Sequence, residues 1–266
     1  MALECGAGCM AFHLAVGILA ASADYGAGVG FGLVATPLLV YLLGVDPRVA
    51  VASALGAQLA SSPIALAAWS ARGTGLPGLS LIVLLALSAV AGIMAGFMAV
   101  RGLSEASALT VYTVALAALA LVYARGSRSQ GRASSQLSKQ VMVAALVAGG
   151  FLAGLGKAVA GGGFSPVVVA VQRLSGVRLE AALASLPIVK PPVFAAAALA
   201  YSAQGFMDLQ ATLALAVGAC IGALAAPSIA GKLGEERIRA LVLLVIAVSA
   251  VKGVYELAAA LVLSGL

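Results

Sequence analysis

Residues 26–37 read GAGVGFGLVATP and residues 154–166 read GLGKAVAGGGFSP. Each stretch has several glycines in a mostly apolar region, followed by a proline five positions after one of them. Glycine and proline both destabilise a helix interior, glycine through its backbone freedom and proline through its missing N–H. The two pairs are Gly32 with Pro37, and Gly161 with Pro166. We therefore expect two broken apolar helices, with the structural breaks at Pro37 and Pro166.

The composition of the chain indicates a membrane environment. Of 266 residues, 63% are hydrophobic and only 9% are charged, and the mean hydropathy is +1.14. A soluble domain has about 25% charged residues, so soluble enzymes, nucleic-acid binders and disordered proteins are excluded. A crossing helix needs about 20 apolar residues. The uncharged runs therefore predict an all-α, polytopic transmembrane bundle of about eight helices, and the net charge of +6 is assigned to loops.

The chain contains two copies of one pattern. The offset between matching residues is 129 from Gly32 to Gly161, and 132 from Gly44 to Gly176. The matches, in order, are Gly32-x4-Pro37 with Gly161-x4-Pro166, Gly44-Val45-x4-Ala50-x-Ala52-Ser53 with Gly176-Val177-x4-Ala182-x-Ala184-Ser185, Trp69 with Tyr201, and Gly92/Gly96 with Gly218/Gly222. Because these matches keep the same order, we interpret the chain as two internal repeats with Gly/Pro-broken segments.

A basic segment separates the copies. Residues 125–139 contain arginine, lysine, serine and glycine and no acidic residue, which is typical of a flexible linker and of cytoplasmic loops. The predicted organisation is a first transmembrane repeat over 1–124, a basic linker over 125–139 and a second transmembrane repeat over 140–266.

The same elements are expected in each copy. A helix leads into the glycine-rich break, a short apolar stretch follows over 33–43 or 164–174, and a long helix and two more helices complete the unit. Irregular backbone at membrane depth is tolerated only inside protein or beside a watery cavity. Paired interruptions in two repeats are typical of transporter binding sites. The sequence leaves open whether each short stretch forms a re-entrant hairpin or part of a broken crossing, and so whether the repeats are parallel or inverted.

The glycines of the breaks favour an anionic ligand. Backbone N–H groups at helix starts bind anions, and glycine lets a ligand approach the backbone closely. The predicted ligand-facing glycines are Gly28, Gly30, Gly32, Gly161, Gly162 and Gly163.

Two lysines lie in apolar surroundings. Lys157 occupies the position of Gly28 in the other copy, and Lys190 occupies the position of Gln58. A lysine at the centre of a membrane helix costs about 2.5–3.5 kcal/mol on insertion scales. We expect both lysines, with Gln58, to contact an anionic substrate. The alternative is a partner carboxylate, or a break that brings the ammonium close to water.

Other polar residues near the breaks are candidates. The hydroxyls of Thr36, Ser53, Ser165 and Ser185 can donate to an oxyanion, or can instead bond to their own helix backbone. Asp24 precedes the first break and has three open roles: pairing with a lysine, carrying a coupled proton, or facing water at an interface.

The motifs of enzymes and metal sites are missing from the sequence. It has no HExxH, P-loop or GxSxG motif, and its single histidine, His13, is best interpreted as a hydrogen-bonded structural residue. No Cys, His or acidic cluster has metal-ligand spacing. We expect no catalytic residue, no metal and no cofactor.

The glycine-rich motifs also resemble a known family. Gly28-x-Gly30-x-Gly32-Leu33-x3-Pro37-Leu38, Ala50-x-Ala52-Ser53-Ala54-Leu55 and Gly161-Gly162-Gly163-x2-Pro166 are similar to the signature of the TauE/SafE sulfite exporters. The resemblance spans nearly the whole chain. It implies a two-repeat, all-helical transporter for sulfite, thiosulfate, sulfoacetate or related organosulfonates of the taurine class.

The expected function is therefore an anion permease, multi-pass in the plasma or inner membrane. Export is favoured because the negative cell interior drives anions outward by about 2.3 kcal/mol per charge per 100 mV. The expected partners are a small anionic substrate and the lipid bilayer, without nucleic acid, and a homo-oligomer is compatible with this interpretation. The alternatives are a permease for another small anion and a membrane scaffold that transports nothing.

Overall fold

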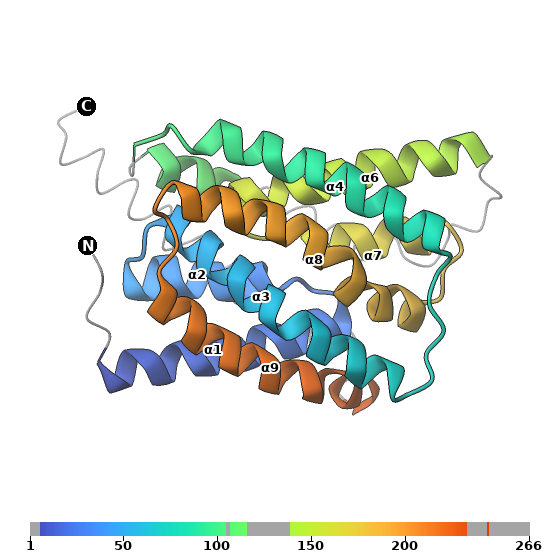
Figure 1. Ribbon diagram of the computed structural model, residues 1–266, viewed down its shortest axis with the longest axis horizontal. Coiled ribbons are helices and arrows are strands. Elements are labelled where there is room, and N and C mark those ends of the chain that lie inside the picture. The colour runs from blue at the N-terminus through green and yellow to red at the C-terminus, as the bar shows by residue number, and fades with distance from the viewer. Residues whose placement is uncertain (1–5, 105–106, 116–138, 233–243, 245–266) are drawn as a thin grey trace.

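The computed structural model describes residues 6–104, 107–115, 139–232 and 244, and this part of the chain is helical without strands (Figure 1). The all-α prediction is confirmed for these residues. The labelled helices are α1 (Ala7–Ala27), α2 (Phe31–Leu43), α3 (Pro47–Ser70), α4 (Leu79–Val100), α6 (Lys139–Ala160), α7 (Phe164–Leu174), α8 (Leu179–Ala203) and α9 (Leu209–Lys232).

Six of the described helices are long and apolar enough to cross a membrane: α1, α3, α4, α6, α8 and α9. The helices α2 and α7 have 13 and 11 residues. At 1.5 Å per residue they are about 20 and 17 Å long, too short for a hydrocarbon core of about 30 Å. The predicted helices over 106–124 and 236–262 lie largely outside the described residues, as does the linker apart from Lys139, so eight crossings remain a prediction.

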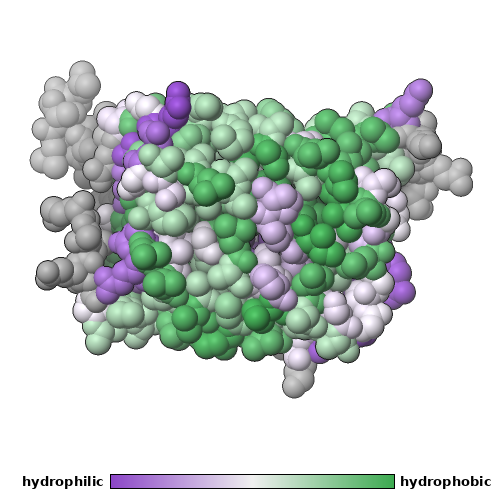
Figure 2. Space-filling view, in the orientation of Figure 1, coloured by the Kyte–Doolittle hydropathy of each residue, from purple (hydrophilic) through white to green (hydrophobic). Residues whose placement is uncertain are grey.

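The exposed surface agrees with a membrane location. Figure 2 shows mainly hydrophobic residues across the middle of this face and the strongly hydrophilic ones toward its two ends. Large apolar side chains such as Leu79, Leu87 and Leu199 are 66–73% exposed. Contact of such an apolar surface with water is unfavourable, whereas contact with lipid tails is not.

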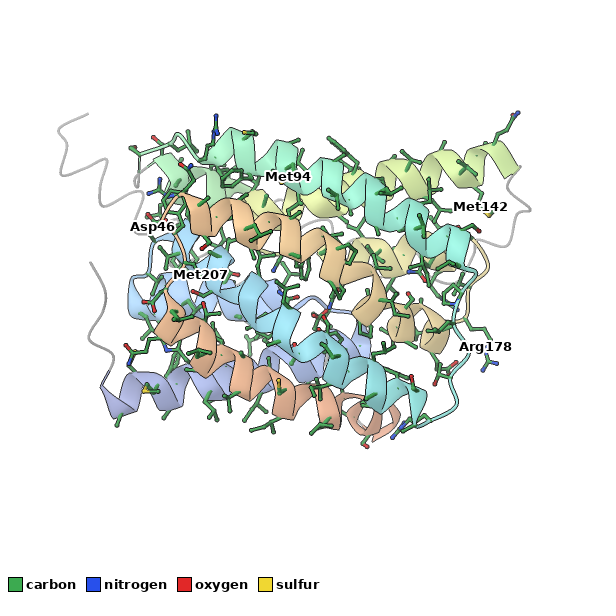
Figure 3. The ribbon with its side chains drawn as sticks, viewed as in Figure 1. Asp46, Met94, Met142, Arg178 and Met207 are labelled. Carbon is green, nitrogen blue, oxygen red and sulfur yellow. The ribbon has the colours of Figure 1, made fainter. Side chains whose placement is uncertain are left out.

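Each short helix folds back as a hairpin. Helix α2 packs against α1, and α7 packs against α6. In Figure 3, Asp46, which follows α2, lies at the same end of the bundle as the start of α1. Met142, near the start of α6, and Arg178, which follows α7, both lie at the opposite end. The two hairpins α1–α2 and α6–α7 therefore enter the bundle from opposite ends.

Glycines, not prolines, break the helices. Helix α1 is followed directly by Gly28, with φ of 69°, and α2 is preceded by Gly30, with φ of 102°. A side chain rarely adopts such positive φ values, so glycine is suited to both positions. The predicted breaks at Pro37 and Pro166 are wrong. Pro37 lies inside α2, and Pro166 lies in the first turn of α7, where the missing N–H has no helical partner to lose.

The paired glycines of the two halves hold helices together. A Cβ on Gly92 of α4 would lie 1.9 Å from the Phe151 carbonyl oxygen of α6. Likewise, a Cβ on Gly218 of α9 would lie 2.1 Å from the Leu14 carbonyl oxygen of α1. Small residues permit such close approach of membrane helices. These glycines thus have a packing role, away from the two breaks.

Candidate functional site

The two helix breaks meet inside the bundle. A Cβ on Gly32, in the first turn of α2, would lie 1.4 Å from the carbonyl oxygen of Gly161, just after α6. The Thr36 hydroxyl donates to the same oxygen at 3.5 Å, and a Cβ on Gly162 would lie 2.5 Å from the side chain of Leu33. The two breaks are therefore in direct contact. Absence of a Cβ at Gly32 is what permits this contact.

Three charged side chains are buried near these breaks. Within the described ranges, Asp24, Lys157 and Lys190 are the buried members among the Asp, Glu, Lys and Arg residues, each 0–1% exposed. Asp24 lies in the last turn of α1, Lys157 in the last turn of α6, and Lys190 in the middle of α8. Three separate helices therefore bring charge into one apolar interior.

Lys190 and Asp24 form an ion pair. The Lys190 Nζ lies 2.5 Å from Oδ2 of Asp24, and 4.2 Å from the centre of the Tyr25 ring. Of the three roles left open for Asp24, the structure shows the pairing with a lysine, and its burial excludes an interfacial position facing water. The other carboxylate oxygen, Oδ1, has no hydrogen-bond partner among the described residues.

Lys157 binds the end of its own helix. Its Nζ donates to the Gly161 carbonyl oxygen at 2.9 Å, and a cation near a helix C-terminus is stabilised by the helix dipole. No described carboxylate forms a salt bridge with Lys157. Because an ammonium has three donors, two of them remain without an acceptor in the part of the chain that the structure describes. Lys157 is therefore a buried cation without a counter-ion among the described residues.

The two lysines share one neighbourhood. The Lys157 Nζ lies 5.4 Å from the ring centre of Phe194, which follows Lys190 by one turn on the same face of α8. The Lys157 ammonium also reaches the start of α2, because a Cβ on Gly32 would lie 2.8 Å from its Nζ.

Both short helices begin without a capping side chain. Helices α2 and α7 begin after Gly30 and Gly163, and neither of these residues provides a side-chain cap. The first N–H groups of a helix have no partner within the helix. At α2 these groups lie beside Lys157, so the positive end of the helix and an ammonium group adjoin. Gly30 also approaches the ring of Pro166, and Gly28 approaches Val169 and Leu183.

The predicted hydroxyl and amide residues are all buried but differ in their partners. Gln58 donates from its side-chain amide to the carbonyl of Ala54 in its own helix at 2.9 Å. The hydroxyl of Ser53 has no hydrogen-bond partner among the described residues, whereas the matching Ser185 donates to the Ala182 carbonyl at 2.7 Å. Ser165 is 1% exposed in the first turn of α7.

Two polar residues at the site were not predicted. Gln172 of α7 donates from Nε2 to the Ser185 hydroxyl at 2.9 Å, and its Oε1 lies 3.1 Å from the same hydroxyl oxygen. The Tyr25 hydroxyl contacts Ser61 and Ser62 at 3.3 and 3.1 Å, and its ring faces Lys190. The sequence shows a glutamine in an apolar run and a tyrosine next to Asp24. Only their contacts with residues of other helices distinguish them from ordinary packing residues.

Other expectations concern residues away from the site. The His13 ring donates from Nδ1 to the Cys9 carbonyl at 2.8 Å, which confirms its interpretation as a hydrogen-bonded residue.

Comparison with known proteins identifies the family. Neither the curated proteins nor the solved structures gave a match. One family sequence model, described as sulfite exporter TauE/SafE, matches residues 13–253, which include both helix breaks and all three buried charges. This match covers most of the chain, and with six apolar candidate spans it identifies a multi-pass membrane protein. The chain belongs to the TauE/SafE sulfite exporter family of membrane transporters.

Proposed function

We propose that this protein is a permease for sulfite or a related sulfur oxyanion or organosulfonate, with Lys157 as the cation that attracts the substrate. The observation that carries this proposal is the Lys157 ammonium, which is buried where the two helix breaks meet and has no counter-ion in the described part of the chain. An isolated buried charge is strongly unfavourable, and an anion next to it offsets that cost. The permease needs no cofactor and performs no covalent chemistry.

The surroundings of Lys157 fit an oxyanion. Sulfite and sulfonates present several oxygens, which accept hydrogen bonds from the ammonium and from backbone N–H groups at a helix start. In this proposal the first turn of α2, at Phe31 and Gly32, supplies backbone donors beside Lys157. The hydroxyl of Ser53, which lacks a protein partner among the described residues, is a further candidate donor.

We also propose that the chain consists of two inverted repeats, over 1–124 and 140–266, joined by the linker 125–139. The reciprocal packing of the halves supports this organisation. The first helix of one half, α1, packs against α9, and its counterpart α6 packs against α4. The hairpins α1–α2 and α6–α7 enter from opposite ends (Figure 1). In inverted repeats the substrate lies at the interface of the halves, where the breaks meet here.

Export is the proposed direction. A membrane potential negative inside drives a monovalent anion outward with about 2.3 kcal/mol per 100 mV. Uptake against this potential requires a coupled cation. Asp24, the acidic residue at the site, is already paired with Lys190, which disfavours it as a freely titrating proton carrier.

The proposal is tested by flux from proteoliposomes loaded with sulfite. Lys157→Gln retains a donor for the Gly161 carbonyl but removes the charge. We expect substrate affinity to fall by about 1.5–3 kcal/mol, the value of a hydrogen bond to a charged group, which is about tenfold or more. Arg178→Gln is the matched control, because Arg178 is 85% exposed at the start of α8. Equal flux through wild type, Lys157→Gln and empty liposomes contradicts the proposal and favours a scaffold role.

A second arm separates sulfur oxyanions from another small anion. Liposomes loaded with chloride in place of sulfite measure the alternative substrate. The site offers several donors around one ammonium, which suits a ligand with several oxygens better than a spherical ion. We therefore expect sulfite flux to exceed chloride flux. The reverse result indicates a permease for another small anion.

A further inference from the structure

The charges at the site can be counted. Asp24 contributes one negative charge, and Lys157 and Lys190 contribute two positive charges. Their sum is +1 when all three are ionised, and the described residues supply no other buried Asp, Glu, Lys or Arg. The Lys190–Asp24 pair is internally balanced at 2.5 Å, so the excess charge belongs to Lys157.

This count has a consequence for the charge of the ligand. In an interior that excludes water, the favourable ligand is the one that brings the total charge to zero, because an uncompensated charge is costly there. A monovalent anion achieves this balance. A divalent anion leaves one negative charge over and places it near the Asp24 carboxylate, where like charges repel.

The hydrogen bonding of Asp24 strengthens this effect. Only Oδ2 of Asp24 binds Lys190, and Oδ1 has no donor among the described residues. One carboxylate oxygen is thus left without a hydrogen-bond donor to offset its charge. Lys190 is held by Asp24 and by the Tyr25 ring, which leaves Lys157 as the principal cation for a ligand.

We infer that the site selects monovalent oxyanions, such as a simple sulfonate or hydrogensulfite, over divalent ones such as sulfate, and that Asp24 sets this limit. The inference rests on the proposed function, because it concerns the substrate class of that same site. Asp24 acts here as a specificity-determining residue through its charge.

Methanesulfonate and sulfate are the two probes. Both are compact sulfur oxyanions of similar size, and neither changes its protonation near neutral pH, so they differ mainly in charge. Their binding to the detergent-purified full chain is measured by titration calorimetry. Trp69, the only tryptophan, gives a second readout, because its indole donates to the Tyr25 carbonyl at 3.2 Å. We expect the wild type to bind methanesulfonate at least about tenfold more tightly than sulfate, the scale of one charge-assisted contact.

Variants of Asp24 test its role. Asp24→Asn raises the count to +2 and is expected to reduce the preference for methanesulfonate by about tenfold or to reverse it. Asp24→Glu keeps the charge and is expected to keep the preference. Glu180→Gln is the control for a change in net charge away from the site, because Glu180 is 59% exposed at the start of α8. This variant is expected to leave the ratio of the two affinities unchanged.

A double variant keeps the test decisive if Asp24→Asn does not fold. Asp24→Asn with Lys190→Gln returns the count to +1 and is expected to show the wild-type preference. Sulfate binding by wild type as tight as methanesulfonate binding overturns the inference, as does an unchanged ratio in folded Asp24→Asn. In both cases the permease proposal still stands. If wild type binds neither anion, both the proposed anion site and this inference are overturned.

Discussion

The Nζ of Lys190 lies 2.5 Å from Oδ2 of Asp24, although 166 residues separate the two along the chain. The pair joins α1 of the first half to α8 of the second, and both side chains are fully buried. Two costly charges therefore stabilise each other, and each depends on the other for its place in the apolar interior.

Removal of one partner of this pair is expected to destabilise the protein. Lys190→Gln leaves the Asp24 carboxylate buried and without a counter-ion, which costs about 3–5 kcal/mol when a buried pair is broken. The double variant Asp24→Asn with Lys190→Gln removes both charges and is expected to recover most of this loss. Thermal unfolding in detergent measures the difference. A Lys190→Gln protein as stable as wild type rules out a structural contribution from the pair.

The Tyr25 side chain is expected to stabilise the site in two separable ways. Tyr25→Phe removes the hydroxyl contacts with Ser61 and Ser62 and costs about 1 kcal/mol of stability. Tyr25→Leu also removes the ring under the Lys190 ammonium, which adds about 0.5–2 kcal/mol. Unfolding of the two variants gives both values. Equal stability of the Phe and Leu variants contradicts a cation–π contribution.

The contact between the two helix breaks is expected to tolerate no side chain at Gly32. Its Cβ would lie 1.4 Å from the Gly161 carbonyl oxygen, so Gly32→Ala forces the two hairpins apart. We expect loss of transport together with a lower melting temperature. Gly75→Ala is the matched control, because no atom lies within 4 Å of its Cβ position and its φ is not positive. Normal flux in Gly32→Ala contradicts the close contact.

The helix contact between α4 and α6 is expected to affect stability without affecting affinity. Gly92→Ala places a Cβ 1.9 Å from the Phe151 carbonyl oxygen, and such overpacking costs about 1–3 kcal/mol. Anion affinity of the protein that remains folded is expected to stay at the wild-type value. Gly102→Ala, in open space, is the control. A changed affinity in Gly92→Ala places this contact within the binding site instead.

Within the described residues, the sequence by itself determined which segments are helices and that their solvent is lipid. Uncharged apolar runs of sufficient length require internally bonded backbone in a membrane, which leaves helices as the solution. The short stretches predicted over 33–43 and 164–174 correspond closely to α2 and α7. The glycine runs marked the breaks because positive φ is a local property of the backbone, readable from residue type. Proline was a poorer marker because the first turn of a helix accepts it, as Pro166 shows.

Only the tertiary structure decided how the charges are used. Lys157 and Lys190 look alike in the sequence, yet one binds a carbonyl at the end of its own helix and the other binds a carboxylate on α1. Which lysine meets Asp24 depends on which faces of α1, α6 and α8 turn toward each other. That choice is made by the packing of helices distant in the chain, through close glycine contacts such as Gly32 with Gly161. The free energy of a buried charge depends on its neighbours, and residue type alone does not specify them.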